Sequence, residues 1–301
     1  MRPTREQELA VLRSVIYASL FEYPLTLAQL GATLVEVSAD TATVAAWWRD
    51  SEFLQAAIEH RDGLYFPAGR SDLVDTRTRR EALSRDLLER DRRLIALVSR
   101  MPFVRMVAVS GSLAHLNAER SADLDLFVIT APHRVWSVTL SVLLIARLLG
   151  WRKRMCLNYV ISQDALSIAP ADLFSANQII HLRPIAGHDV FADFIDANPF
   201  VRNFYPNFLA GQQANRPTGK QAIRLSLERF LNVGMAPLFE KASRWIYGRH
   251  LARRASSWRS RDQVRLEPEC LKLHTSSHRA ETLQRFEAAL ARAVKAIHSA
   301  A

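Results

Sequence analysis

Hydrophobic positions in residues 1–70 follow first a helical and then an extended period. Apolar residues three or four positions apart predict three helices, and two short apolar runs around Asp62-Gly63 predict a hairpin. Ser38 or Asp40 is expected to cap the third helix. The predicted helices span about 6–21, 26–34 and 40–49, and the predicted hairpin strands span 53–58 and 64–66.

This order of three helices and a hairpin resembles a winged helix, which implies DNA binding through the third helix. That helix carries Arg49 as its positive charge, and the module holds more acidic than basic side chains. Because contacts to phosphates dominate DNA affinity, this charge balance argues against DNA binding. We interpret the module as a structural element or as a docking surface for a partner.

A strongly charged helix is predicted over 72–100. Its arginines alternate with acidic residues three or four positions away, which is typical of a solvated helix face whose charges pair with one another. Its apolar positions, among them Leu87 and Leu94, are expected to pack on the segment that follows. We therefore take this segment as a connecting helix.

The next stretch places acidic residues beside a loop of small residues. A strand is predicted over 124–129, and side chains alternate along a strand, so Asp123 and Asp125 are expected on one face. Mg²⁺ prefers hard oxygen ligands, commonly one or two carboxylates plus substrate phosphates. In the preceding loop, Gly111 lets the backbone approach a phosphate closely and Ser112 can donate hydrogen bonds to it. The two aspartates are therefore candidate ligands of Mg²⁺ or Mn²⁺.

The spacing resembles the signature of the polymerase-β-like nucleotidyltransferase superfamily. A predicted strand over 103–109 precedes Gly111-Ser112, ten residues follow, and Asp123 and Asp125 are separated by one hydrophobic residue. The resemblance implies an enzyme that transfers a nucleoside monophosphate from a nucleoside triphosphate (NTP) to a hydroxyl acceptor and releases pyrophosphate. It implies that the two aspartates are catalytic metal ligands and that Gly111 and Ser112 contact the nucleotide. The acceptor stays open among a small hydroxylated molecule, a protein side chain and a nucleic-acid end.

The resemblance also implies a third acidic residue, on the strand after the next helix. That strand is predicted over 155–161, after a helix over 135–149, and it contains no acid. Asn158 stands at the expected place, but an amide cannot accept a proton as a base. Asp164, just beyond the strand, is the alternative. Two interpretations follow: an enzyme that works with two carboxylates, or a non-catalytic nucleotide-binding or regulatory protein with a degenerate transferase site.

Positive charge is concentrated in the C-terminal region. The net charge is +10, and residues 216–301 alone hold 17 basic and 7 acidic side chains, a difference of +10. Helical spacings predict a basic helical region there, after a linker near 215–219. Its basic face either packs on the transferase domain or meets an anionic partner, namely a membrane surface, a nucleic acid or a polyanionic acceptor.

Histidines and cysteines offer two further candidates. Cys270, His274 and His278 are four residues apart and would share one helical face, but a fourth zinc ligand is not evident, so an ordinary packing face is preferred. His115, beside the Gly-Ser loop, either reaches a phosphate or covers the short helix.

Composition places the chain among globular proteins. It is 49% hydrophobic, and two cysteines do not make a disulfide framework. The first ten residues lack the apolar core of a secretion signal, so we expect a cytoplasmic protein. The apolar stretch 135–150 is too short for a membrane span and is interpreted as a buried helix. The expected α+β architecture consists of a winged-helix-like domain (1–70), a connecting helix (71–100), a mixed-sheet nucleotidyltransferase domain (101–215) and a basic helical C-terminal region (216–301).

Overall fold

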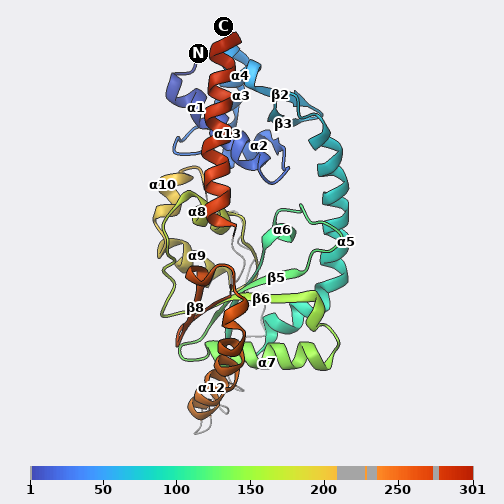
Figure 1. Ribbon diagram of the computed structural model, residues 1–301, viewed down its shortest axis with the longest axis vertical. Helices are drawn as coiled ribbons and strands as arrows, with labels where there is room; N and C mark the ends of the chain where they lie inside the picture. The colour runs from blue at the N-terminus through green and yellow to red at the C-terminus, as the bar shows by residue number, and fades with distance from the viewer. Residues whose placement is uncertain (1, 209–227, 229–235, 274–277, 301) are drawn as a thin grey trace.

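The computed structural model describes residues 2–208, 228, 236–273 and 278–300 (Figure 1). The chain is α+β, with a small N-terminal module, a long connecting helix and a six-stranded mixed sheet that has helices on both faces. Within these described ranges, no helix is long and apolar enough to cross a membrane.

Local capping signals build the N-terminal module. Its helices are α1 (Arg5–Ser19), α2 (Leu27–Ala32), α3 (Thr41–Asp50) and α4 (Glu52–Ala57), and its sheet has the order β1 (Leu25–Thr26), β3 (Leu64–Pro67), β2 (Ile58–Arg61). Thr4 begins α1 with a capping box. Asp40 begins α3 by accepting a hydrogen bond from the Thr43 N–H at 2.7 Å. The Asp62-Gly63 turn joins β2 to β3, with both residues at positive φ, so the predicted turn is confirmed.

The predicted strand over 53–58 is wrong except at its last residue. Glu52–Ala57 is α4, and β2 begins only at Ile58. Ser51 caps α4, because its side chain accepts a hydrogen bond from the Leu54 N–H at 3.1 Å. The glutamine and alanines at 55–57 favour a helix, and they outweigh the short apolar run that indicated a strand.

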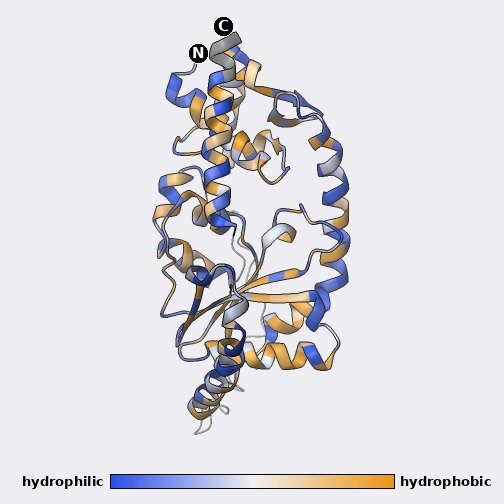
Figure 2. Cartoon of the chain, in the orientation of Figure 1, coloured by the Kyte–Doolittle hydropathy of each residue, from blue (hydrophilic) through white to orange (hydrophobic). Residues whose placement is uncertain are grey.

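The connecting helix α5 has the predicted bounds, Asp72–Arg100. Figure 2 shows hydrophilic residues along most of its length. Not all of its charges pair within the helix. Arg80 forms an ion pair with Glu22 of the N-terminal module at 2.7 Å and another with Glu119 beside the central sheet at 2.9 Å. This helix therefore ties the two parts of the molecule together.

The central sheet separates two hydrophobic cores. In sheet order its strands are β7 (Arg183–Ala186), β4 (Val104–Ser110), β5 (Leu124–Thr130), β6 (Met155–Ser162), β9 (Cys270–Leu273) and β8 (Val264–Glu267). The nearby helices are α6 (Gly111–Ala114), α7 (Val135–Leu148), α8 (Leu173–Ile180), α9 (His188–Asp196) and α10 (Phe200–Phe204), with single 3₁₀ turns at Arg152–Arg154, Ala255–Ser257 and Arg261–Gln263. Ala108 and Phe127 face the core shared with the N-terminal module, α8 and α9. Val109 and Val128 face the core under α5 and α7.

The C-terminal region is not wholly helical, so that expectation is wrong. The hairpin of β8 and β9 completes the central sheet, because β9 pairs antiparallel with β6. Helix α12 (Ala236–Arg254) packs on α7, and α13 (Arg279–Ala300) returns to pack on α1, α4 and α8 (Figure 1). The expected division at 215–216 therefore does not separate this region from the sheet. The predicted linker near 215–219 lies outside the described residues.

Basic side chains project from α12. Lys241, Arg244 and Arg249 are exposed, and Trp245 between them is 64% exposed. The helix itself packs on α7, as one interpretation expected, and Arg244 lies 6.0 Å from the Trp136 ring centroid, whereas Lys241 and Arg249 remain exposed. An anionic partner for this region stays a prediction.

Candidate functional site

Strand β4 ends at the Gly-Ser loop, beside the acids of β5. Ser110, the last residue of β4, pairs in register with Asp125. Gly111 then leads into α6 with φ +65°, and a Cβ placed on it would lie 2.5 Å from Asp125 Oδ2. Glycine is thus favoured twice, by the left-handed backbone and by the close approach of the carboxylate. Gly111, Ser112 and Asp125 all line one cavity, so the structure brings these predicted site residues together.

The two aspartates form a pair of like charges at the start of β5. Asp123 is exposed just before the strand, and Asp125 is partly buried. Burial and then the charge of Asp123 raise the pKa of Asp125 to about 6. A divalent cation would relieve this repulsion, and carboxylate oxygens are the ligands that Mg²⁺ and Mn²⁺ prefer. The donor set therefore fits the implied metal.

Cys156 of β6 lies next to this acid pair. The parallel register of β5 and β6 places it beside Asp125, and its thiol donates a hydrogen bond to Asp123 Oδ2 at 3.7 Å. Burial and then the two carboxylates raise the pKa of Cys156 to about 11, so the thiol stays protonated at neutral pH. Asn158 lies in β6 where the register shifts between Asp125 and Phe127. Its side chain is outside the described set, so its proposed metal-binding role stays a prediction.

Asp164 lies at the opposite end of the paired strands. The register that joins Asp125 to Cys156 joins Thr130 to Ser162. Six steps along β6, at about 3.3 Å each, place these ends about 20 Å apart. The expectation that Asp164 supplies the third acid is therefore wrong. Across the described ranges, no group of three or more His, Cys, Asp or Glu side chains is arranged to hold a metal ion.

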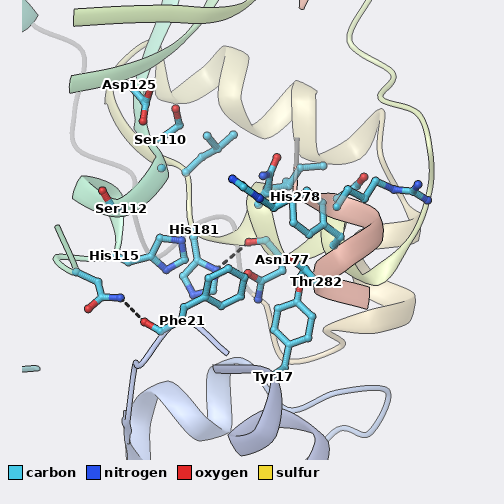
Figure 3. Close-up of a pocket in the computed structure, with 18 of the residues that line it drawn as sticks. Tyr17, Phe21, Ser110, Ser112, His115, Asp125, Asn177, His181, His278 and Thr282 are labelled. Atoms are coloured by element: carbon cyan, nitrogen blue, oxygen red, sulfur yellow. Dashed lines mark hydrogen bonds between the residues drawn. The ribbon is translucent and has the colours of Figure 1, made fainter. Parts of the chain in front are cut away.

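A cavity of about 560 Å³ extends from Asp125 to the N-terminal module (Figure 3). This volume is within the range of about 300–1,000 Å³ that is usual for small-molecule sites. Its aromatic walls are Tyr17, Phe21, Tyr23, Phe127, Tyr159, Phe174 and Tyr205. Its polar lining includes Ser110, Ser112, Asn177, Gln178 and Lys272. The N-terminal module and the C-terminal region thus both contribute to the site.

Lys272 of β9 brings a buried positive charge to this cavity. Its residue is 7% exposed, and it lies beside Tyr159, which in turn lies beside Phe127 on the face that carries Asp125. Its Nζ is 3.4 Å from Gln263 Oε1 and 5.4 Å from the Tyr159 ring centroid. Burial lowers the pKa of the ammonium group. Among the described residues no carboxylate pairs with Lys272, so its charge is available to an anion in the cavity.

Two histidines stack in the cavity wall. The rings of His115 and His181 have centroids 3.9 Å apart, and Tyr23 packs its edge on His115 at 6.0 Å. Burial lowers the pKa of both histidines, that of His181 to about 4, so both rings are neutral at pH 7. A neutral ring carries no charge for a phosphate. The stacking makes His115 a packing residue of the wall, and a contact between its neutral N–H and a phosphate stays a prediction.

The helical face expected for Cys270, His274 and His278 does not form. Cys270 lies in β9 and is 7% exposed, and His278 comes immediately before α13. His274 lies outside the described residues. The structure thus gives this candidate zinc site no common face.

Sequence reasoning missed Cys156, Lys272 and Tyr17. The pairing of β6 with β5 and β9 places Cys156 and Lys272 at the site. Tyr17 lies there because α1 packs over the sheet. The short alternation of apolar and charged residues in 264–267 was the available signal for the hairpin that carries Lys272.

No protein-family model, no curated protein and no solved structure matches this chain. Its function is therefore argued from the geometry of the site.

Proposed function

We propose that this chain is a Mg²⁺- or Mn²⁺-dependent nucleotidyltransferase that moves a nucleoside monophosphate from an NTP to a hydroxyl acceptor. The observation that carries the proposal is the contact at Gly111, where the missing side chain lets the Gly-Ser turn lie against the Asp125 carboxylate. Transfer from a nucleotide needs a turn that binds phosphate directly beside carboxylates that bind metal.

Each group at the site has a chemical task. Asp123 and Asp125 would hold the metal, which when bound neutralises the triphosphate. The N–H groups and the hydroxyl of Gly111-Ser112 donate hydrogen bonds to phosphate oxygens of the leaving pyrophosphate. Lys272 adds a buried positive charge to the same cavity. The acceptor oxygen bonds to the α-phosphorus, the bond from this phosphorus to pyrophosphate breaks, and the acceptor proton passes to water.

In this proposal the N-terminal module resembles a winged helix, but its role is to form part of the cavity wall and not to bind DNA. Its three-stranded sheet has the order β1-β3-β2, and the hairpin follows the helices. Residues 1–70 hold 6 basic and 9 acidic side chains, a net charge of −3, which does not suit a DNA-binding surface. Helix α1 places Tyr17 in the cavity wall and Phe21 follows shortly after it.

Replacement of the acids tests the proposal. We expect Asp123→Ala and Asp125→Ala to abolish metal-dependent release of pyrophosphate, because each removes a ligand of the cation. Asp164→Ala is the matched control, since it removes a carboxylate at the far end of the same strands and should keep full activity. ATP, CTP, GTP and UTP are each tested with Mg²⁺ or Mn²⁺, first by thermal shift and then by pyrophosphate release. Unchanged turnover in Asp125→Ala would falsify the assignment.

A non-catalytic nucleotide-binding or regulatory protein is the second candidate. It is favoured by Cys156, which occupies the position of β6 beside the acid pair and is a protonated thiol rather than a carboxylate. A general base is commonly worth about 10²–10⁴-fold, so its absence slows an enzyme without abolishing the reaction. NTP binding without pyrophosphate release in the wild-type chain would favour this candidate over the enzyme.

A further inference from the structure

Tyr17 carries a buried hydroxyl that the fold does not satisfy. The residue is 3% exposed and lines the cavity, and its Oη has no hydrogen-bond partner among the described residues. A buried hydroxyl without a partner costs about 1–3 kcal/mol. Such a group inside a cavity of this size indicates that a ligand supplies the missing hydrogen bond.

Residues from three separate helices line the cavity together with this hydroxyl. Tyr17 comes from α1, Asn177 from α8 and Thr282 from α13, and Figure 3 shows the Tyr17 ring directed toward Thr282. Asn177 is held in place because its amide donates to the Tyr205 hydroxyl at 3.0 Å. We call this end of the cavity, defined by Tyr17, Asn177 and Thr282, the inner subsite.

The inner subsite is closed and close to neutral. Thr282 is 5% exposed and Tyr205 is 1% exposed, so these side chains form a buried wall that leaves little room for an extended chain. Arg279, which lies one turn before Thr282 on α13, forms an ion pair with Asp172. The rings of Tyr17 and Tyr205 supply apolar area. These walls suit a small uncharged ring better than a phosphate or an extended chain.

We propose that the inner subsite binds the acceptor, a small uncharged cyclic or aromatic molecule with two hydroxyl groups. One hydroxyl hydrogen-bonds to Tyr17 Oη, and the other reaches toward Asp125, which lines the same cavity. This inference rests on the proposed nucleotidyltransferase function. It selects a small molecule from the three acceptor classes that the sequence leaves open.

Two probes that differ by one hydroxyl test the subsite. They are 4-hydroxybenzyl alcohol and benzyl alcohol, and calorimetry measures their binding to the full chain without NTP or metal. We expect 4-hydroxybenzyl alcohol to bind roughly three- to tenfold more tightly, which is the usual effect of one hydrogen bond. Tyr17→Phe should remove this difference. Because it deletes only a hydroxyl without a partner, the variant should fold as well as the wild type.

Tyr247→Phe is the matched control, since it removes a tyrosine hydroxyl on α12, away from the cavity, and should keep the difference between the probes. Ala18→Leu, which adds bulk to the cavity wall, should weaken both probes. The inference is overturned if neither probe binds, or if Tyr17→Phe still discriminates between them.

Nucleotide binding separates this inference from the proposed function. We expect Tyr17→Phe to leave the Kd of the NTP with Mg²⁺ unchanged and to raise the KM for 4-hydroxybenzyl alcohol in pyrophosphate release. A weaker NTP Kd in Tyr17→Phe would assign the subsite to the nucleotide and overturn the inference. If the wild-type chain binds 4-hydroxybenzyl alcohol but no NTP, the proposed nucleotidyltransferase function is rejected. The acceptor role of the subsite is then rejected as well, and Tyr17 belongs to a small-molecule site of another function.

Discussion

At the scale of single residues, Gly111 places the backbone of the proposed phosphate-binding turn against the Asp125 carboxylate, a proposed metal ligand. An added Cβ would meet Asp125 Oδ2 at 2.5 Å, whereas the Asp125 Cβ is 3.3 Å away. The nearest atom belongs to the end of a rotatable side chain, so the carboxylate moves more easily than the backbone. We therefore expect a methyl group at Gly111 to affect the proposed reaction more than folding.

We expect Gly111→Ala to lower the free energy of unfolding by about 1 kcal/mol, the cost of a left-handed conformation for an L-residue, and to reduce pyrophosphate release at least tenfold. Gly150→Ala is the control, because Gly150 also has positive φ, +71°, but nothing lies within 4 Å of an added Cβ. It should show the loss of stability without the loss of activity. Equal activity losses in the two variants would contradict the role of the Asp125 contact. Urea unfolding and pyrophosphate release measure the two effects.

At the scale of elements, the β8–β9 hairpin extends the sheet and places a charge in the cavity. Burial of the Lys272 ammonium group is unfavourable, and Arg265 lies opposite it in the register. This like-charge pair adds to the cost. The hairpin therefore carries a residue that reduces stability and is well placed to attract phosphates.

We expect Lys272→Met to keep or raise the melting temperature and to weaken NTP binding about 10- to 100-fold, which is the usual range for a lost hydrogen bond to a charged group. Met retains the apolar stem that packs on Tyr159. Lys241→Met, on the exposed surface of α12, is the control for loss of a positive charge and should bind NTP as the wild type does. Thermal shift and calorimetry with NTP and Mg²⁺ measure both effects. A marked drop in stability with unchanged NTP affinity would show that Lys272 is structural.

The elements also show which parts of the fold local sequence predicts. The charge pattern of α5 and the apolar runs of β4 and β5 are strong local signals, and these elements lie within a residue or two of their predicted bounds. Helical spacings predict helix throughout the C-terminal region, but residues 264–273 form a hairpin that depends on pairing with β6, a strand far away in the sequence. Which residue of β6 lies beside Asp125 depends on how the two parallel strands are aligned, and this alignment cannot be predicted from the local sequence. The sequence therefore points to Asn158 and Asp164 for the third position, whereas the register places Cys156 there.

At the scale of the whole molecule, one hydrophobic core crosses the boundaries between the expected domains. It contains Val15 and Tyr17 of α1, Phe127 of β5, Phe194 of α9 and Phe286 of α13. Phe286 packs edge-on against Tyr17 with ring centroids 5.3 Å apart. Helix α13 thus covers the N-terminal module with a segment from the opposite end of the chain. The module and the sheet are expected to unfold in a single transition, because both contribute residues to this one core.

Phe286→Ala tests this coupling. The residue is 4% exposed, so we expect the free energy of unfolding to fall by about 3–5 kcal/mol, as for other buried phenylalanines. Hydrogen exchange of peptides from α3 and from β5 reports on the module and the sheet separately. If the core is shared, the free energy of opening measured by hydrogen exchange should fall by a similar amount in both peptides. A decrease confined to the α3 peptide would show that the module unfolds alone. Phe239→Ala is the control, because Phe239 on α12 is 49% exposed and its truncation should cost less than about 1 kcal/mol.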